Sequence, residues 1–363
     1  MLDRMNADTT PSDDLAAFEP ELGLTEEQKH ALEVAGKMET LRSLHIVTDR
    51  DIAITTALNR LFKIGEDGKP SYQPVLFTGE TETQGITLIE GSGGGKTTAI
   101  IKTLKAFEPL VLNEETGLPR YLHVKVESPA SLRSLGCSIL EKLGVDKVSD
   151  RSKTYDIWAL VRHRLWLAGI RLLWLDEAQD MFRSASATEL DSMFKTLKSL
   201  MQGDHPVVLL LSGTERLSAM TGLDPQINRR FAKIRPRPLK FGEDTDRLAK
   251  LVRGFARKAG LDVDVPRDHY DRLMRAGRHR FGRCIELILQ SIEIALQDRV
   301  KTLTLDHFAM AFSHKESLLD DKNIFTDFAW EQISLPDEDD EVYEAERVAA
   351  QQASKTRKRK KAA

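Results

Sequence analysis

The sequence predicts an α/β protein in which helices cover both faces of a parallel β-sheet, followed by a small all-helical domain. Short apolar runs at 86–89, 171–176 and 206–211 have the length and aliphatic character of buried strands. Segments with apolar residues at helical spacing separate these runs, and crossovers of this length favour parallel strands. From residue 241 onward the pattern is helical throughout, which predicts the second domain.

Composition sets limits on the class of protein. A chain of 363 residues with 41% hydrophobic and 30% charged residues is long enough for two compact units plus tails, and its profile is that of a soluble protein. The net charge of −3 does not by itself indicate a nucleic-acid partner. Two cysteines, Cys137 and Cys284, lie in helical patterns without metal-site spacing, which indicates a reducing compartment. No run is long enough to span a membrane and no signal core is present, so we expect a cytoplasmic protein without a membrane partner.

Changes in pattern along the chain predict the domain boundaries. We expect a disordered acidic N-terminus, a helical extension and loop beginning at the N-cap Thr25, a nucleotide-binding core, a helical lid and a C-terminal tail. The tail has an acidic segment followed by the basic segment KTRKRKK. The corresponding ranges are 1–24, 25–84, 85–240, 241–315 and 316–363.

The strongest motif is a glycine-rich loop between a strand and a helix, in the stretch ITLIEGSGGGKTT. Such a loop points backbone N–H groups at phosphate oxygens, its lysine reaches the β- and γ-phosphates, and the next hydroxyl holds Mg²⁺. A flexible linker would not end in Lys-Thr-Thr at the start of an apolar-striped helix. The predicted ATP-binding residues are Gly91, Ser92, Gly93, Gly94, Gly95, Lys96, Thr97 and Thr98.

One position departs from this P-loop pattern, because Glu90 stands where the strict pattern has glycine. A carboxylate beside a triphosphate is unfavourable. We therefore expect the Glu90 side chain to point away from the phosphates while Gly91 makes the tight turn.

A second motif, RLLWLDEAQD, has four apolar residues that end in Asp176 and Glu177. A strand of this kind about eighty residues after a P-loop is typical of a Walker B motif. Asp176 is then predicted to hold Mg²⁺ together with Thr97, and Glu177 to polarise the water that attacks the γ-phosphate. The two motifs together predict an ATP- and Mg²⁺-dependent enzyme.

Two further segments carry polar or basic residues beyond these motifs. The strand PVVLLL ends in Ser212 and Thr214, and Thr214 is equally suited to cap the next helix. The segment 228–240, NRRFAKIRPRPLK, is basic and contains no acid. It fits an arginine finger at Arg230 or Arg229, a phosphate-backbone track for nucleic acid, or a solvated edge strand.

Taken together, GGGKTT, WLDEAQDMF, LLLSGT, INRRF and the helical lid resemble the TniB/TnsC-type AAA+ ATPases of transposons, over roughly residues 40–315. The resemblance implies an AAA+ fold, with Ser212 or Thr214 as the residue that senses the γ-phosphate. It also implies that Arg283 of the lid contacts the nucleotide and that Arg230 reaches the nucleotide of a neighbouring subunit.

The same resemblance implies a function in DNA transposition. Members of this family assemble on duplex DNA as ATP-dependent rings or helical filaments, with about six subunits per turn, and engage a DDE transposase and in some cases a target-site adaptor. For this chain, the resemblance places candidate DNA contacts at Lys125, Arg133, Arg151 and Lys153. Ordinary surface charge is the alternative for each of these four residues.

Two other functions fit the same motifs. Secretion-type assembly ATPases also carry a DEAQ Walker B motif, but they need a membrane segment that this sequence does not contain. A nucleotide-switched scaffold would bind ATP and hardly hydrolyse it.

Overall fold

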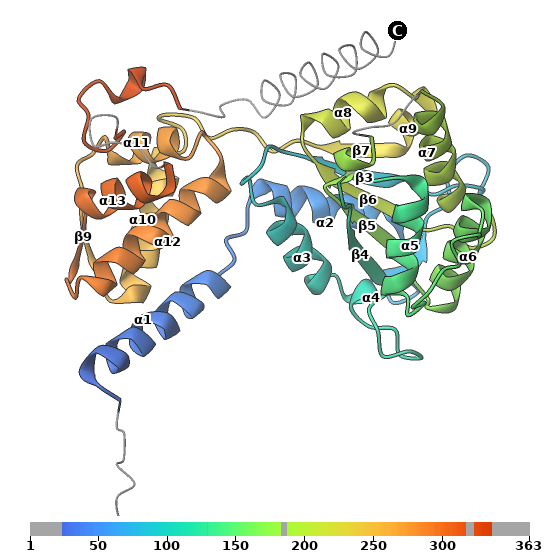
Figure 1. Ribbon diagram of the computed structural model, residues 1–363, viewed down its shortest axis with the longest axis horizontal. Helices are drawn as coiled ribbons and strands as arrows, with labels where there is room; N and C mark the ends of the chain where they lie inside the picture. Colours follow the sequence, from blue (N-terminus) through green and yellow to red (C-terminus); the bar gives the residue numbers. More distant parts are fainter. Residues whose placement is uncertain (1–23, 129, 183–186, 317–322, 336–363) are drawn as a thin grey trace, which may run out of the picture.

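The computed structural model describes residues 24–128, 130–182, 187–316 and 323–335. Figure 1 shows an α/β core joined to a separate helical body. The predicted acidic N-terminus (except Leu24), the C-terminal acidic and basic segments, and Pro129 lie outside the described residues. Among the helices that the structure describes, none is long and apolar enough to cross a membrane.

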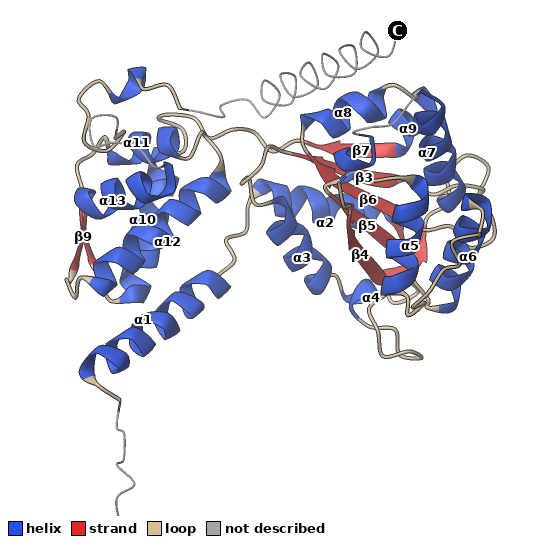
Figure 2. Cartoon of the chain, viewed as in Figure 1, coloured by secondary structure: helices blue, strands red, loops and turns tan. Residues whose placement is uncertain are grey.

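The core is built on a parallel sheet, as the sequence predicts (Figure 2). Within the described residues it has five strands in the order β4-β5-β6-β3-β7, and every neighbouring pair is parallel. Because β3 lies between β6 and β7, the loop after β3 emerges beside the end of β6, one strand away from the end of β5. The strands are β3 (Gly85–Ile89), β4 (Tyr121–Lys125), β5 (Leu172–Asp176), β6 (Val208–Gly213) and β7 (Phe231–Ile234).

Alternate residues of the strands pack into two separate hydrophobic cores, one on each face of the sheet. In β5, Leu172 and Trp174 pack on one face of the sheet, whereas Leu173 and Leu175 pack on the other. Successive side chains of a strand point to opposite faces, and a sheet that is covered on both faces needs apolar residues at every position. This requirement explains the continuous apolar runs in the sequence.

Helices cover both faces of the sheet (Figure 1). One layer is formed by α2 (Asp49–Leu61), α3 (Lys96–Ala106) and the short α4 (Glu108–Val111), which share a core with the Trp174 face. The other layer is formed by α5 (Leu132–Lys142), α6 (Thr154–Leu167), α7 (Ala187–Leu200), α8 (Glu215–Gly222) and α9 (Pro225–Arg230), together with the 3₁₀ helix η1 (Ala178–Phe182).

The lid is helical but contains one small strand pair. Its helices are α10 (Thr245–Ala259), α11 (His269–Ala276), α12 (Phe281–Gln297) and α13 (Leu305–Glu316). Strands β8 (Asp262–Asp264) and β9 (Thr302–Thr304) pair in parallel within it. The sequence pattern predicts helices only, because three-residue strands leave no periodic signal.

Two segments outside the predicted lid belong to its core. The first is α1 (Glu26–Ser43), whose Val34, Met38 and Leu41 pack with α10 and α12. The second is 323–335, which includes the 3₁₀ helix η3 (Trp330–Gln332) and buries Ile324 and Phe325 in the same cluster. The segment 25–84 is therefore divided, since α1 packs on the lid and α2 packs on the sheet.

Local details refine the element boundaries. The predicted cap at Thr25 is present as a capping box with Gln28. The loop expected before the core contains a hairpin of β1 (Phe62–Ile64) and β2 (Pro70–Pro74), and an isolated bridge joins Phe77 to Glu82. Helix α5 begins at Leu132, because Ser131 caps it.

Candidate nucleotide site

The glycine-rich loop lies between β3 and α3, and Lys96 is the first residue of the helix. Gly95 has a φ of 99°, a left-handed conformation that side chains strain, so a glycine is required before the helix begins. The buried Lys96 ammonium donates to the carbonyl oxygens of Glu90 (2.8 Å) and Gly91 (3.3 Å). It therefore lies across the mouth of the loop.

The two predicted magnesium ligands lie side by side. The Thr97 hydroxyl donates to the Asp176 carboxylate at 2.9 Å, which joins the start of α3 to the end of β5. A hydroxyl and a carboxylate oxygen are ligands that suit Mg²⁺, which completes its octahedron with water and phosphate oxygens. The residues present therefore fit the ion that the motifs imply.

Asp176 is held by more contacts than the sequence analysis predicted. Ser212 donates to it at 2.5 Å, and the Trp174 indole donates to Ser212 at 2.8 Å. His123 stacks on Trp174 and lies 3.8 Å from Asp176. Burial raises the pKa of Asp176, but the nearby His123 imidazole and the hydrogen bonds from Ser212 and Thr97 together hold that pKa below its usual value. The carboxylate is thus kept ionised.

Ser212 is fully buried, so its contacts are with Asp176 and Trp174. Thr214 lies at the N-cap position of α8, and its side chain makes no capping hydrogen bond. Of the two predicted sensor residues, Ser212 supports the carboxylate and Thr214 is the better placed to meet a ligand.

Glu177 lies just beyond the strand in a strained conformation. Its φ is 54°, in the left-handed region that non-glycine residues rarely adopt. The Gln179 amide donates to its carboxylate at 2.6 Å, and the Gln179 oxygen accepts from the Thr214 N–H at 3.3 Å. Gln179 is buried, and it connects the predicted catalytic carboxylate to the end of β6.

The lid reaches the loop through the first turn of α12. Arg283, the predicted lid arginine, lies against Gly93, where an added Cβ would come within 2.8 Å of its side chain. Arg280, which the sequence analysis did not single out, donates to the Ser92 carbonyl at 2.7 Å, and its guanidinium group covers Gly91. The Gly282 N–H donates to the Gly94 carbonyl at 3.2 Å. The lid is therefore docked on the P-loop.

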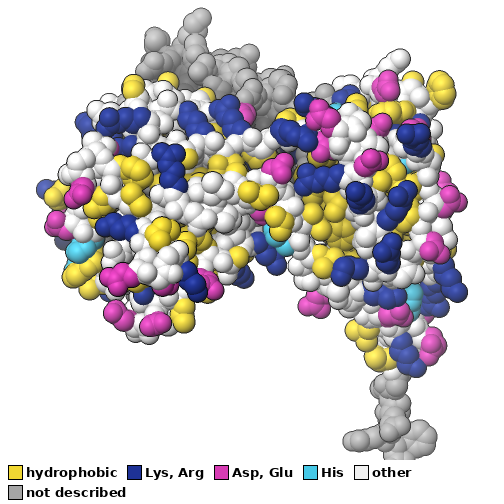
Figure 3. Space-filling model, turned by 180° about the vertical axis from the view of Figure 1, so that it is seen from behind, with side chains coloured by type: hydrophobic (Ala, Val, Ile, Leu, Met, Phe, Trp, Pro, Cys, Tyr) yellow, Lys and Arg dark blue, Asp and Glu magenta, His cyan; other side chains and the backbone are white. Residues whose placement is uncertain are grey.

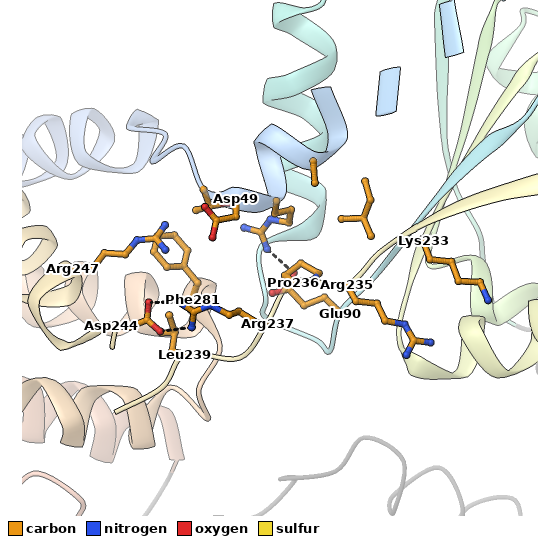
Figure 4. Close-up of a pocket in the computed structure, with 14 residues that line it drawn as sticks. Asp49, Glu90, Lys233, Arg235, Pro236, Arg237, Leu239, Asp244, Arg247 and Phe281 are labelled. Carbon is orange, nitrogen blue, oxygen red and sulfur yellow. Dashed lines mark hydrogen bonds and ion pairs between the residues drawn. The ribbon is translucent and has the colours of Figure 1, made fainter. Parts of the chain in front are cut away.

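A pocket of about 390 Å³ adjoins the loop (Figure 4). It lies between the start of α2, the segment after β7 and the lid, and Figure 4 shows the Phe281 ring and Leu239 on the lid side. Its wall is mixed, with apolar surfaces beside charged groups such as Arg237, which binds Asp244 at 2.7 Å. A flat heterocycle attached to phosphates in the loop would fit such a pocket.

Part of the core resembles a known protein family. Residues 75–240 match the family model of the bacterial TniB protein. This part of the core is therefore similar to the bacterial TniB family. A comparison with curated proteins found no match.

Solved structures share the fold. The Aeropyrum pernix ORC1 protein, in a complex with DNA, is 17% identical with a TM-score of 0.51, over 74% of this chain and 65% of that one. The ADP form of the Aeropyrum pernix ORC2 protein is 18% identical with a TM-score of 0.50, over 76% and 71% of the two chains. These likenesses confirm the predicted parallel sheet followed by a helical lid.

The two arginines at the end of α9 have different environments. Arg230 is buried and pairs with the buried Glu82 carboxylate. Arg229 lies 3.5 Å from the same carboxylate, and its side chain is 60% exposed. To reach another subunit, Arg230 would have to leave a buried ion pair, whereas Arg229 would leave only a longer contact from a largely exposed side chain.

The four candidate DNA residues also differ. Lys125, Arg151 and Lys153 are exposed at the end of β4 and before α6. Arg133 is half-buried, and its guanidinium group donates to the carbonyls of Ser149 and Ser152, which gives it a structural role. Figure 3 shows Lys and Arg side chains spread over the rear face of both bodies rather than gathered in one patch. On this face, the surface charge does not by itself mark a DNA track.

Proposed function

We propose that this protein is an ATPase that assembles on duplex DNA in an ATP-dependent manner and engages a DDE transposase in DNA transposition. The observation that carries the proposal is the contact between Thr97 and Asp176, 2.9 Å apart at adjoining edges of a core that matches the TniB family. A P-loop hydroxyl bound to a Walker B carboxylate is the arrangement that nucleotide hydrolysis needs.

In this proposal the chain holds the phosphates from several sides. The N–H groups of Gly91 to Thr98 and the Lys96 ammonium bind them, while Thr97 and Asp176 hold Mg²⁺. When bound, the ion neutralises charge on the phosphate oxygens. Glu177 accepts the proton of the attacking water, and Thr214 and Arg283 contact the γ-phosphate from the end of β6 and from the lid.

Assembly would follow from sharing this site between subunits. We propose that Arg229, which is exposed beside the Arg230–Glu82 pair, makes the contact across the interface. An arginine supplied by a neighbour stabilises the charge of the transition state, so hydrolysis depends on assembly. ATP then favours the assembled form, and ATP hydrolysis causes the assembly to come apart.

DNA binding would be mainly to phosphates and tolerant of sequence, with Lys125, Arg151 and Lys153 as contacts. The DDE transposase, and where present a target-site adaptor, would engage the assembled form. The KNIFTDF segment and the basic C-terminus are the candidate contacts.

Electron microscopy with duplex DNA, with and without a slowly hydrolysed ATP analogue, tests the proposal. We expect rings or filaments on DNA only when the analogue is present, and none with Lys96→Ala. Glu177→Gln should assemble with ATP itself but not hydrolyse it. Single particles under all conditions, or wild-type hydrolysis as slow as that of Glu177→Gln, would favour a nucleotide-switched scaffold instead.

A further inference from the structure

The glutamate that departs from the P-loop pattern has a buried partner from another element. An Arg50 Nη of α2 lies 2.5 Å from the Glu90 carboxylate, and the two side chains are only 6% and 12% exposed (Figure 4). The Lys96 ammonium binds the main-chain carbonyl of Glu90 and leaves its carboxylate to Arg50. The negative charge is therefore turned toward α2 and neutralised there, away from the loop's lysine.

The same nitrogen of Arg50 makes a second hydrogen bond, to the Gly94 carbonyl at 2.8 Å. In a trans peptide the carbonyl and the following N–H point in opposite directions. Fixing the Gly94 carbonyl toward Arg50 therefore fixes the Gly95 N–H away from it. The lid donates to the same carbonyl through the Gly282 N–H, so α2, the P-loop and the lid meet at one oxygen atom.

The glycines of the loop accommodate this arrangement. A Cβ at Gly94 would overlap the Glu90 side chain, and a Cβ at Gly95 would come within 3.1 Å of the Arg50 guanidinium group. A larger residue at Gly94 would displace the Glu90 side chain, and one at Gly95 would push the Arg50 guanidinium group by a few tenths of an ångström. The Arg50–Glu90 pair is therefore packed within the loop and is not an ion pair on its surface.

We infer that Arg50 is a positioning residue that makes Glu90 compatible with a phosphate site, by neutralising its carboxylate and orienting the Gly94–Gly95 peptide. The inference rests on the proposed binding of ATP at this loop. It implies that Arg50 and Glu90 act as a unit, so the effect of changing one depends on the presence of the other.

A double-mutant cycle with a fluorescent ATP analogue tests the unit. With Glu90 present, Arg50→Met leaves a buried carboxylate without its cation, and we expect the analogue to bind at least tenfold more weakly. Glu90→Gln alone should bind within about threefold of wild type, because its charge is already neutralised. In Arg50→Met/Glu90→Gln, affinity should return to within about threefold of Glu90→Gln. The exposed pair of Arg42 and Glu293 supplies a matched control, since Arg42→Met should leave affinity unchanged.

Steady-state kinetics separates positioning from general damage. The loss in Arg50→Met should appear in KM, with kcat at saturating ATP within about twofold, and Arg50→Lys should restore part of the affinity. If Arg50→Met does not fold, Arg50→Lys with and without Glu90→Gln gives the same comparison. Equal losses in both backgrounds, or a tenfold gain on Glu90→Gln alone, would overturn the inference. Failure of wild type to bind the analogue would instead refute the proposed nucleotide site.

Discussion

The side-chain amide of Gln179 donates a 2.6 Å hydrogen bond to the carboxylate of Glu177, and its oxygen accepts from the Thr214 N–H. A change at the end of β6, where a γ-phosphate would be sensed, can therefore alter the position of the predicted base. Glu177 also has a φ of 54°, so its backbone does not relax freely to compensate for a lost contact.

We expect Gln179→Ala to lower kcat about tenfold and to leave KM within about twofold, because the change misplaces the base without touching the phosphates. Steady-state ATPase assays and analogue binding check this. Gln73→Ala, a change at an exposed position of β2, is the control. An equal fall in affinity and kcat would show that Gln179 supports the whole site rather than Glu177.

Arg229 and Arg230 should separate catalysis from stability. Arg230→Ala leaves the buried Glu82 carboxylate without its main partner, and we expect a loss of about 3 kcal/mol in the free energy of unfolding. Arg229→Ala should cost less than about 1 kcal/mol, because the side chain is largely exposed.

We expect Arg229→Ala also to reduce the ATPase rate of the assembled protein at least tenfold, since the in-trans contact is lost. Thermal unfolding and the dependence of the ATPase rate on protein concentration are the measurements. If the Arg230→Ala protein folds but its ATPase rate no longer depends on protein concentration, while the Arg229→Ala protein stays active, the contact in trans belongs to Arg230.

Phe325 should hold the 323–335 segment in the lid. Its ring is 1% exposed and packs near Phe308 and Phe312. Phe325→Ala should therefore destabilise the lid by about 3 kcal/mol. Phe328→Ala is a matched control from the same segment, because that side chain is 98% exposed. Denaturant unfolding measures both, and similar midpoints for the two variants would contradict the packing described above.

His269 should make the stability of the lid depend on pH. It is fully buried beside Phe308, and burial lowers its pKa from 6.5 to about 3. As the pH falls below 6.5, the unfolded chain takes up a proton at His269 before the folded chain does. The contribution of this residue to the free energy of unfolding is therefore fully present above pH 6.5 and is lost progressively between pH 6.5 and 3. The loss from this residue is about 2 kcal/mol at pH 5.

Urea unfolding at pH 7 and pH 5 measures this dependence. A His269→Phe variant that folds should lose about 2 kcal/mol less than wild type between the two pH values. The same loss in both proteins would assign the pH dependence to other groups.

The fold could be predicted from sequence because its signals are local. The apolar run that ends in Asp176 can be recognised without knowing its neighbouring strands, because a strand covered on both faces is apolar at every position. The Gly-rich turn before Lys96 likewise requires a left-handed residue at Gly95. The boundaries of the lid were harder to predict, because α1 and the segment 323–335 are far apart in sequence and meet only in the folded core.

Sequence by itself determined the chemical groups of the site: a lysine and a hydroxyl at the start of one helix, and two carboxylates at the end of one strand. Only the tertiary structure decided which groups support them. Arg50, His123 and Arg280 belong to no motif, and they reach the site from α2, β4 and the lid. Gln179 stands in the second motif, but only the fold shows that it binds Glu177 from η1. The physical reason is that local backbone geometry fixes the P-loop and the strand end, whereas neutralising Glu90 and restraining Glu177 depend on side chains that packing brings together.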